Sequence, residues 1–169
     1  SKFCLYDSIR MFYANGGGPC YIVSVGDFSE QDTADYFTDL EEGLTTLRKE
    51  DEPTLILFPD AANLFGTADG ANDKVNLGNL QKAALKQCND LQDRFCIFDI
   101  ADGDTELNLA DDDSKTPDLA FRDNIGVQYL KYGASYYPYL KTSLSFDFGY
   151  NDFKDGITKK GAAVTLGAL

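Results

Sequence analysis

The stretch Ser8–Val25, SIRMFYANGGGPCYIVSV, decides how the fold begins. Apolar residues at Leu5, Ile9 and Phe12 lead into three glycines and a proline, and a run of strand-forming residues follows. Because apolar residues at this spacing form one helical stripe, a helix is predicted over residues 3–15. Glycine just past a helix, with proline behind it, is a stop signal. We therefore interpret Gly16–Gly18 as a helix end and Cys20–Val25 as a strand buried on both faces.

The three glycines have a second interpretation, as a cradle for a phosphate group. In dinucleotide-binding folds a Gly-rich loop follows a strand and opens a helix, so that the positive end of the helix dipole faces the phosphate. Here the order is reversed, because the predicted helix precedes Gly16–Gly18 and the predicted strand follows them. The phosphate-loop pattern that ends in GKS or GKT is absent too. We favour the helix end.

Outward from this stretch, helical and extended patterns alternate. Two apolar stripes predict helices, one through Phe37, Leu40, Leu44 and Leu47 and the other through Leu77, Leu80, Ala84, Cys88 and Leu91. The apolar runs Thr54–Phe58 and Arg94–Ile100 predict strands. The remaining expectations are a polar connection over Ala61–Lys74 with a helical turn at Ala61–Phe65, a short helix at Pro117–Asn124, an extended run at Ala134–Phe148 and a weak strand at Ala163–Leu166.

This alternation predicts the fold class. Continuous apolar strands separated by amphipathic helices indicate an α/β domain, in which a mainly parallel sheet is flanked by helices on both faces in three layers. The chain of 169 residues suits one domain. We assign residues 1–148 to this core and residues 149–169 to a Gly- and Lys-bearing tail. Because the chain opens inside a predicted helix, we expect it to be a fragment of a longer protein.

Composition narrows the classes of function. The formal charge is −13, from 28 acidic and 15 basic residues, so nucleic acid and anionic membrane surfaces would repel the chain. No apolar run approaches the roughly 20 residues that a membrane helix requires. The chain has no histidine, which excludes Ser-His-Asp and Cys-His catalysis within it.

The four cysteines form no CxxC pair and are far apart in the sequence. A zinc site would require all four thiolates to converge. Cys20 and Cys96 lie in predicted buried strands, Cys88 lies on a predicted apolar helix face, and Cys4 lies near the start of the chain. We interpret them as small buried hydrophobic residues of a protein from a reducing compartment.

Three aspartates are the best candidates for chemistry. Asp60 and Asp99 follow or end predicted parallel strands, at the sheet edge where α/β proteins bind ligands, and Asp102 lies close behind. Such carboxylates hold a magnesium ion or act as an acid and base pair. Aspartate also caps helices and turns. We favour capping, because no partner base or phosphate loop accompanies them.

Two further clusters favour structural interpretations. The acidic run Asp102–Lys115, which includes Asp111–Asp113, lacks the ligand spacing of a calcium loop and is typical of a solvated loop. A tyrosine cluster would form a stacking platform for bases or sugars if Tyr136 and Tyr137 were exposed, but we favour the core or a protein interface. Its members are Tyr129, Tyr132, Tyr136, Tyr137 and Tyr139.

Several segments, in this order, resemble the tail sheath proteins of contractile phages and of related bacterial contractile injection systems. They are DSIRMFYANGGGPCYIVSVG (Asp7–Gly26), KEDEPTLILFPDA (Lys49–Ala61), LQKAALKQCNDLQDRFCIFDI (Leu80–Ile100) and NIGVQYLKYGASYYPYLKTS (Asn124–Ser143). In the last segment an aromatic-proline-aromatic run enters a strand, as it does in the family. The resemblance spans roughly residues 3–145 and rests mostly on packing residues.

The resemblance implies a structural role. Sheath proteins stack as hexameric rings into a helical sleeve around an inner tube, and contraction drives the tube through a target envelope. Their core is likened to subtilisin without its catalytic residues, so no catalytic, cofactor-binding or metal-binding residue is expected here. The implied partners are further copies of the chain, the inner tail tube protein, and baseplate and terminator proteins. The implied place is a virion tail or an injection particle assembled in the bacterial cytoplasm.

The resemblance does not cover the terminal arms with which sheath subunits exchange strands, so we expect this stretch alone not to polymerise. Two other functions stay open. One is an α/β hydrolase or metal-dependent enzyme that uses Asp60, Asp99 and Asp102. The other is a small-molecule or carbohydrate-binding module built on the tyrosine cluster.

Overall fold

The computed structural model describes residues 3–27, 33–63, 70–104 and 117–144, together with residues 158–159 and 162–163. Its helices are α1 (Leu5–Ala14), α2 (Thr33–Leu47), α3 (Gly70–Leu91) and α4 (Pro117–Ile125), with the 3-10 turns η1 (Ala61–Asn63) and η3 (Leu130–Tyr132). Its strands are β1 (Leu55–Leu57), β2 (Phe95–Asp99), β3 (Gly133–Tyr136), β4 (Thr158–Lys159) and β5 (Ala162–Ala163). The mixture of helices and parallel strands confirms the predicted α/β class.

The main sheet has three parallel strands in the order β1-β2-β3. Ile56 lies opposite Cys96, and Cys96 lies opposite Gly133. Parallel neighbours require a crossover, and α3 supplies the crossover between β1 and β2. Asp99 ends β2 directly beside Tyr136 of β3, so these two residues mark the carboxyl edge of the sheet.

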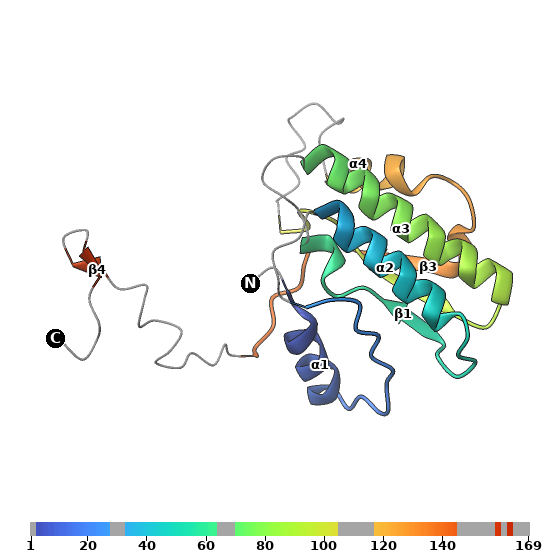
Figure 1. The fold of residues 1–169 in the computed structure, drawn as a ribbon, viewed down its shortest axis with the longest axis horizontal. Helices are drawn as coiled ribbons and strands as arrows, with labels where there is room; N and C mark the ends of the chain where they lie inside the picture. Colours follow the sequence, from blue (N-terminus) through green and yellow to red (C-terminus); the bar gives the residue numbers. More distant parts are fainter. Residues whose placement is uncertain are drawn as a thin grey trace.

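One face of the sheet packs against helices and forms the core. Ile56, Cys96 and Phe98 point into a cluster with Leu85 and Cys88 of α3. Figure 1 shows α2 and α3 lying side by side along the sheet, with α4 beside α3. A second cluster joins α2, η1 and α3 through Phe37, Ala61, Leu77, Leu80 and Ala101. Because side chains alternate along a strand, these clusters account for only half of the sheet residues.

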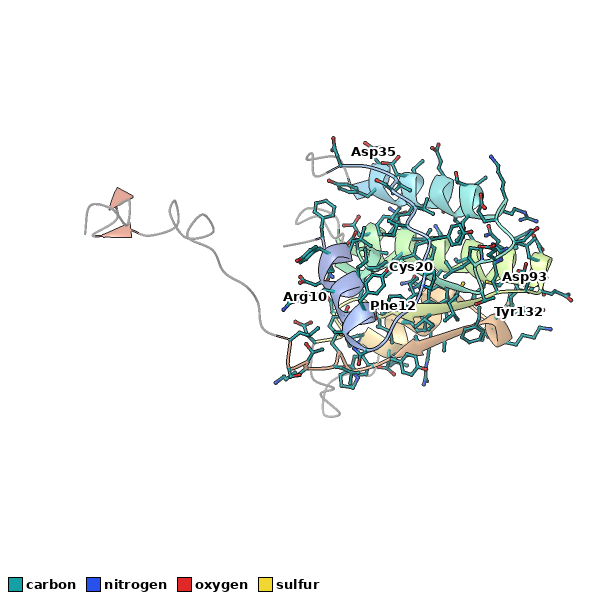
Figure 2. The ribbon with its side chains drawn as sticks, turned by 90° about the horizontal axis from the view of Figure 1, so that it is seen from below. Arg10, Phe12, Cys20, Asp35, Asp93 and Tyr132 are labelled. Carbon is teal, nitrogen blue, oxygen red and sulfur yellow. The ribbon has the colours of Figure 1, made fainter. Side chains whose placement is uncertain are left out.

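The opposite face of the sheet is only partly covered. Leu55 and Leu57 are 54% and 55% exposed there. Of the helices, α1 lies over this face, with Phe12 beside Leu57 and Ile97. Figure 2 shows α1, which carries Phe12 and Arg10, at the end of the molecule away from Asp93. The sheet therefore has a closed face and a largely open one.

The predicted strand Cys20–Val25 is wrong, because this segment pairs with no strand of the described sheet. Tyr21 and Ile22 are 53% and 57% exposed rather than buried. The segment lies against α2, where a Cβ atom on Gly43 would come 2.5 Å from Cγ1 of Val25. Apolar composition gives a segment strand propensity, but a strand forms only where a neighbour supplies hydrogen bonds.

The glycines do end α1, as predicted. Gly16 adopts a left-handed conformation with φ 85°, which costs little for a residue without Cβ. Its N–H donates to the Tyr13 carbonyl at 3.0 Å, and the Gly17 N–H donates to the Phe12 carbonyl at 2.9 Å. This pair of bonds is a Schellman motif, which satisfies carbonyl groups at the helix end. A Cβ on Gly17 would also overlap the Phe12 ring.

Other boundaries differ in part from the prediction. The polar connection assigned to Ala61–Lys74 is wrong in its second half, because α3 begins at Gly70. The turn at η1, the helix α4 and the start of the extended run at β3 agree with the prediction. The weak strand overlaps β5 at Ala163, and β5 pairs with β4 in antiparallel fashion. Asp111–Asp113 and residues 145–148 lie outside the described residues.

Candidate functional site

A groove between α1 and the carboxyl edge of the sheet brings together two of the sequence candidates. The helix end contributes Gly16 and Gly17, and strand β2 contributes Asp99. The walls are mostly apolar and include Met11, Phe12, Leu57, Pro59 and Ile97. The glycines enter this groove as the end of α1, so no helix N-terminus points at it from Gly16–Gly18, and the phosphate cradle is not formed.

Asp99 supplies the acidic group of the groove. Strand alternation places it on the same face as Ile97, away from buried Phe98. The neighbouring protein atoms remove water from its carboxyl group, and this burial raises the pKa of Asp99 above the ordinary aspartate range. Burial and then the nearby Asp99 charge raise the pKa of Tyr139 to about 12. Because Asp99 also remains exposed at the groove, its carboxyl group is open to a hydrogen-bond donor or a cation.

The Asp60 carboxylate bonds backbone groups of the chain instead of facing a ligand site. Its Oδ1 accepts hydrogen bonds from the backbone N–H of Cys4 and from that of Leu5, the latter at 3.0 Å. These are unpaired donors at the start of α1, so Asp60 caps a helix that lies 55 residues away in the sequence. The capping interpretation holds, although the capped helix precedes Asp60 rather than following it.

Asp102 is also engaged. Its carboxylate forms an ion pair with Lys74 Nζ at 2.6 Å, from a left-handed backbone position with φ 57°. Among the described residues, no group of three or more histidine, cysteine, aspartate or glutamate side chains is placed to hold a metal ion. Asp60, Asp99 and Asp102 therefore lie at one edge of the sheet but do not converge on a shared point.

The tyrosine cluster is divided between the core and the surface. The Tyr139 hydroxyl donates to the Ile100 carbonyl at 2.6 Å, and its ring packs over Gly103. Tyr132 packs partly buried against the main core, whereas Tyr136 is 66% exposed. Tyr137 is half-buried. Tyr139 is therefore committed to contacts within the fold, whereas exposed Tyr136 is available for contacts with other molecules.

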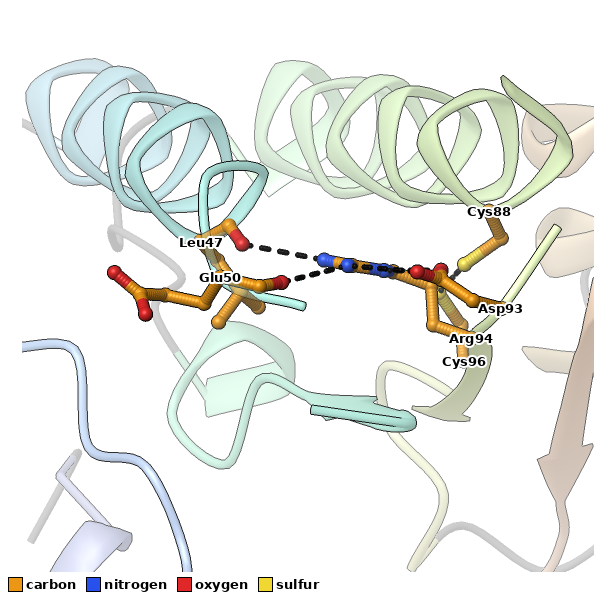
Figure 3. Close-up of polar contacts among 6 residues, drawn as sticks. All are labelled: Leu47, Glu50, Cys88, Asp93, Arg94 and Cys96. Atoms are coloured by element: carbon orange, nitrogen blue, oxygen red, sulfur yellow. Dashed lines mark hydrogen bonds and ion pairs between the residues drawn. The ribbon is translucent and has the colours of Figure 1, made fainter. Parts of the chain in front are cut away.

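Sequence reasoning missed the buried Arg94, which is only 4% exposed. Figure 3 shows its guanidinium donating to the carbonyl of Leu47 at 3.2 Å and to that of Glu50 at 2.8 Å. A third bond joins it to the Asp93 carboxylate at 2.8 Å. No local pattern predicts this role, because two of the acceptors lie more than 40 residues away. Arg94 thus ties the end of α2 to the start of β2.

The cysteines agree with the prediction at the two positions of the core. Cys88 and Cys96 are fully buried, and all four cysteines are free thiols. Cys4 is half-buried. The expected burial of Cys20 is wrong, because the strand that would have buried it does not form. Its Sγ lies 3.6 Å from the Tyr13 hydroxyl at the surface.

In comparisons with known proteins, no protein-family model matches the chain, and no curated protein sequence matches it. Within the described part of the chain, no helix is both long enough and apolar enough to cross a bilayer.

Proposed function

We propose that the protein is a structural subunit of a contractile tail sheath. The observation that carries the proposal is a set of exposed apolar side chains on α1, on the segment after it and on strands of the main sheet, which we name the α1 face. Its members are Tyr6, Met11, Phe12 and Tyr13 of α1, Tyr21 and Ile22 of the following segment, Leu55 and Leu57 of β1, and Tyr136 of β3. Clustered exposed apolar residues are typical of surfaces that other proteins cover.

The sequence resemblance specifies the kind of assembly. The segments that resemble sheath proteins include α1 with its glycine end, β1, the second half of α3, β2 and β3. The parallel α/β sheet is compatible with the sheath core domain. The finer architecture, a three-layer subtilisin-like core without catalytic residues, is part of this proposal.

The bonds that two of the three candidate aspartates make within the chain also support a structural role. Asp60 caps α1 and Asp102 pairs with Lys74. Asp99 alone of the three has a free approach from the groove. A hydrolytic or phosphotransfer site needs a base, a nucleophile or a metal ion in mutual contact, and a single carboxyl group does not supply one.

In the proposed mechanism, energy is stored in the packing between subunits. Copies of the chain stack as rings around an inner tail tube, between baseplate and terminator proteins, in a virion tail or an injection particle. Contraction moves each subunit from a metastable packing to a tighter one, as bistable interfaces allow. No nucleotide, metal ion or catalytic residue takes part.

Negative-stain electron microscopy of the complete natural protein tests the proposal, with sedimentation as a companion measurement. Striated tubes or stacked rings are the expected result, and deletion of the terminal arms should abolish them. A uniformly monomeric complete protein would contradict the proposal.

The second candidate is a metal-dependent enzyme, which the position of the Asp99 carboxyl group in the wall of the groove favours. Calorimetric titration with magnesium or calcium ions tests this candidate. Binding that Asp99→Asn abolishes would support it, whereas an absence of binding would exclude a metal site at this edge of the sheet.

A further inference from the structure

The two buried cysteines lie in contact at the centre of the core. Cys88 comes from α3 and Cys96 from β2, and their sulfur atoms are 3.3 Å apart. Both side chains are 0% exposed. Their contact joins the helix and strand layers on either side of the turn at Gln92 and Asp93.

The surroundings of this pair make the two sulfur atoms unequal. The hydrogen bond between the two thiols, followed by the positive charge of Arg94, lowers the pKa of Cys88 despite burial. The pKa of Cys96 is raised, first by the same hydrogen bond and then by burial. Arg94 is held in place by its bonds to Leu47 and Glu50. Of the two thiols, Cys88 is therefore the one that loses its proton more readily.

We propose that Cys88 and Cys96 form an oxidation site that reacts with a hydroperoxide and closes into a disulfide between α3 and β2. The Cys88 thiolate attacks one oxygen of hydrogen peroxide, and the O–O bond breaks. The leaving hydroxide takes up a proton and departs as water, which leaves Cys88 as a sulfenic acid. Cys96 then loses its proton, its sulfur attacks the Cys88 sulfur, and the S–O bond breaks to release a second water.

Overall, two thiols lose two electrons and two protons to one peroxide, which becomes two waters. Hydrogen peroxide is close to water in size, so a transient local unfolding of the core would be enough to admit it to the buried pair. The bond would add a covalent link between two layers that meet through packing and through a hydrogen bond from Gln81 of α3 to the Asp99 carbonyl of β2. It is reversible by thiol reductants, whereas single oxidised cysteines proceed to irreversible sulfinic acid. This inference stands independently of the proposed function.

Peptide mapping after treatment of the full chain with hydrogen peroxide tests the inference directly. Trypsin cleaves after Lys86, Arg94 and Lys115, so the two cysteines fall in separate peptides, residues 87–94 and 95–115. The expected product is one linked species whose mass is lower than the sum of the two peptides by two hydrogen atoms. Dithiothreitol should release both peptides, and the oxidised chain should unfold roughly 5–10 °C higher than the reduced chain.

Three variants provide the controls. Cys20→Ser removes an exposed thiol outside the pair and should leave the linked species unchanged. Cys88→Ala should abolish it, and Cys96→Ala should abolish it while Cys88 proceeds to sulfinic acid. If the alanine variants do not fold, the wild-type map alone decides the matter. Recovery of both peptides as separately alkylated thiols, with Cys20 oxidised, would overturn the inference.

Discussion

At the scale of single residues, Arg94 is a buried side chain that joins the end of α2 to the start of β2. It is buried, and its planar guanidinium serves two backbone carbonyl groups and one carboxylate at once. Its bond to Asp93 lowers the pKa of that carboxyl group, although Asp93 itself is largely exposed. A side chain without this fork makes none of these bonds, although the Leu47 carbonyl still accepts from the Glu50 N–H at 3.1 Å.

We therefore expect Arg94→Met to lower the free energy of unfolding by about 2–4 kcal/mol, since a hydrogen bond made by a charged group contributes about 1.5–3 kcal/mol. Urea denaturation followed by circular dichroism measures this loss. Arg48→Met is the matched control, because the Arg48 side chain is 47% exposed and its ion pair with Asp90 is long, at 3.4 Å. The control should cost less than about 1 kcal/mol. Equal losses for the two variants would contradict the role given to Arg94.

Also at the residue scale, Asp99 should make stability depend on pH. Burial raises the pKa of Asp99 in the folded state, so between the unfolded and folded pKa values the native chain holds more of this proton than the unfolded chain. The contribution of Asp99 to stability therefore falls as pH rises from about 4 through the folded pKa.

Asp99→Asn removes this titration, so the stability of the variant relative to the wild type should rise over the same pH interval and then level off. Urea unfolding of both proteins at a series of pH values measures the difference. A difference that stays constant across the series would contradict the raised pKa.

At the scale of the elements, Gly43 determines how closely the segment 20–25 approaches α2. Leucine is a better helix former than glycine by about 1 kcal/mol. Gly43→Leu should nevertheless lower the free energy of unfolding by about 1–3 kcal/mol, because its side chain would displace Val23 and Val25. Thermal denaturation measures the net effect. Thr46→Leu, at an exposed position of the same helix, should be nearly neutral.

An increase in stability for Gly43→Leu would mean that the segment 20–25 is not packed on α2. The same contact explains why the segment stays in place without strand hydrogen bonds. Tyr21 adds a bond from its hydroxyl to the Glu52 carboxylate at 2.5 Å, just before β1. The segment is therefore held at both ends, although it is not a strand.

At the scale of the whole molecule, the α1 face should be an assembly surface. Leu57→Lys places a charge at a position that is 55% exposed, so the chain should fold normally while contacts between subunits are lost. Electron microscopy of the complete natural protein should then show fewer or no tubes. Val127→Lys, at a position that is 87% exposed and outside the α1 face, is the control and should assemble as the wild type does. Tubes that persist in Leu57→Lys would exclude this face.

How much of the structure could be predicted from the sequence also differs with scale. The helix stripes, the glycine end of α1 and the parallel strands β1 and β2 followed from patterns within about a dozen residues, because periodicity and capping are local properties. The start of α3 at Gly70 was missed, since its first turn is polar and carries no apolar stripe. The position of Asp99 at the sheet edge was also predictable, because parallel strands end together.

What the sequence determined by itself is therefore the class of fold and most of its elements. Only the tertiary structure decided that Cys20–Val25 lies on α2 without pairing with a strand and that Asp60 caps a helix that precedes it by 55 residues. The same is true of the bonds that buried Arg94 makes to Leu47 and Glu50 and of the contact between Cys88 and Cys96. Each of these depends on partners distant in the chain, and their contact is set by how the layers pack. A local sequence pattern does not predict such partners, because these contacts form, and contribute to stability, only when folding has brought distant parts of the chain together.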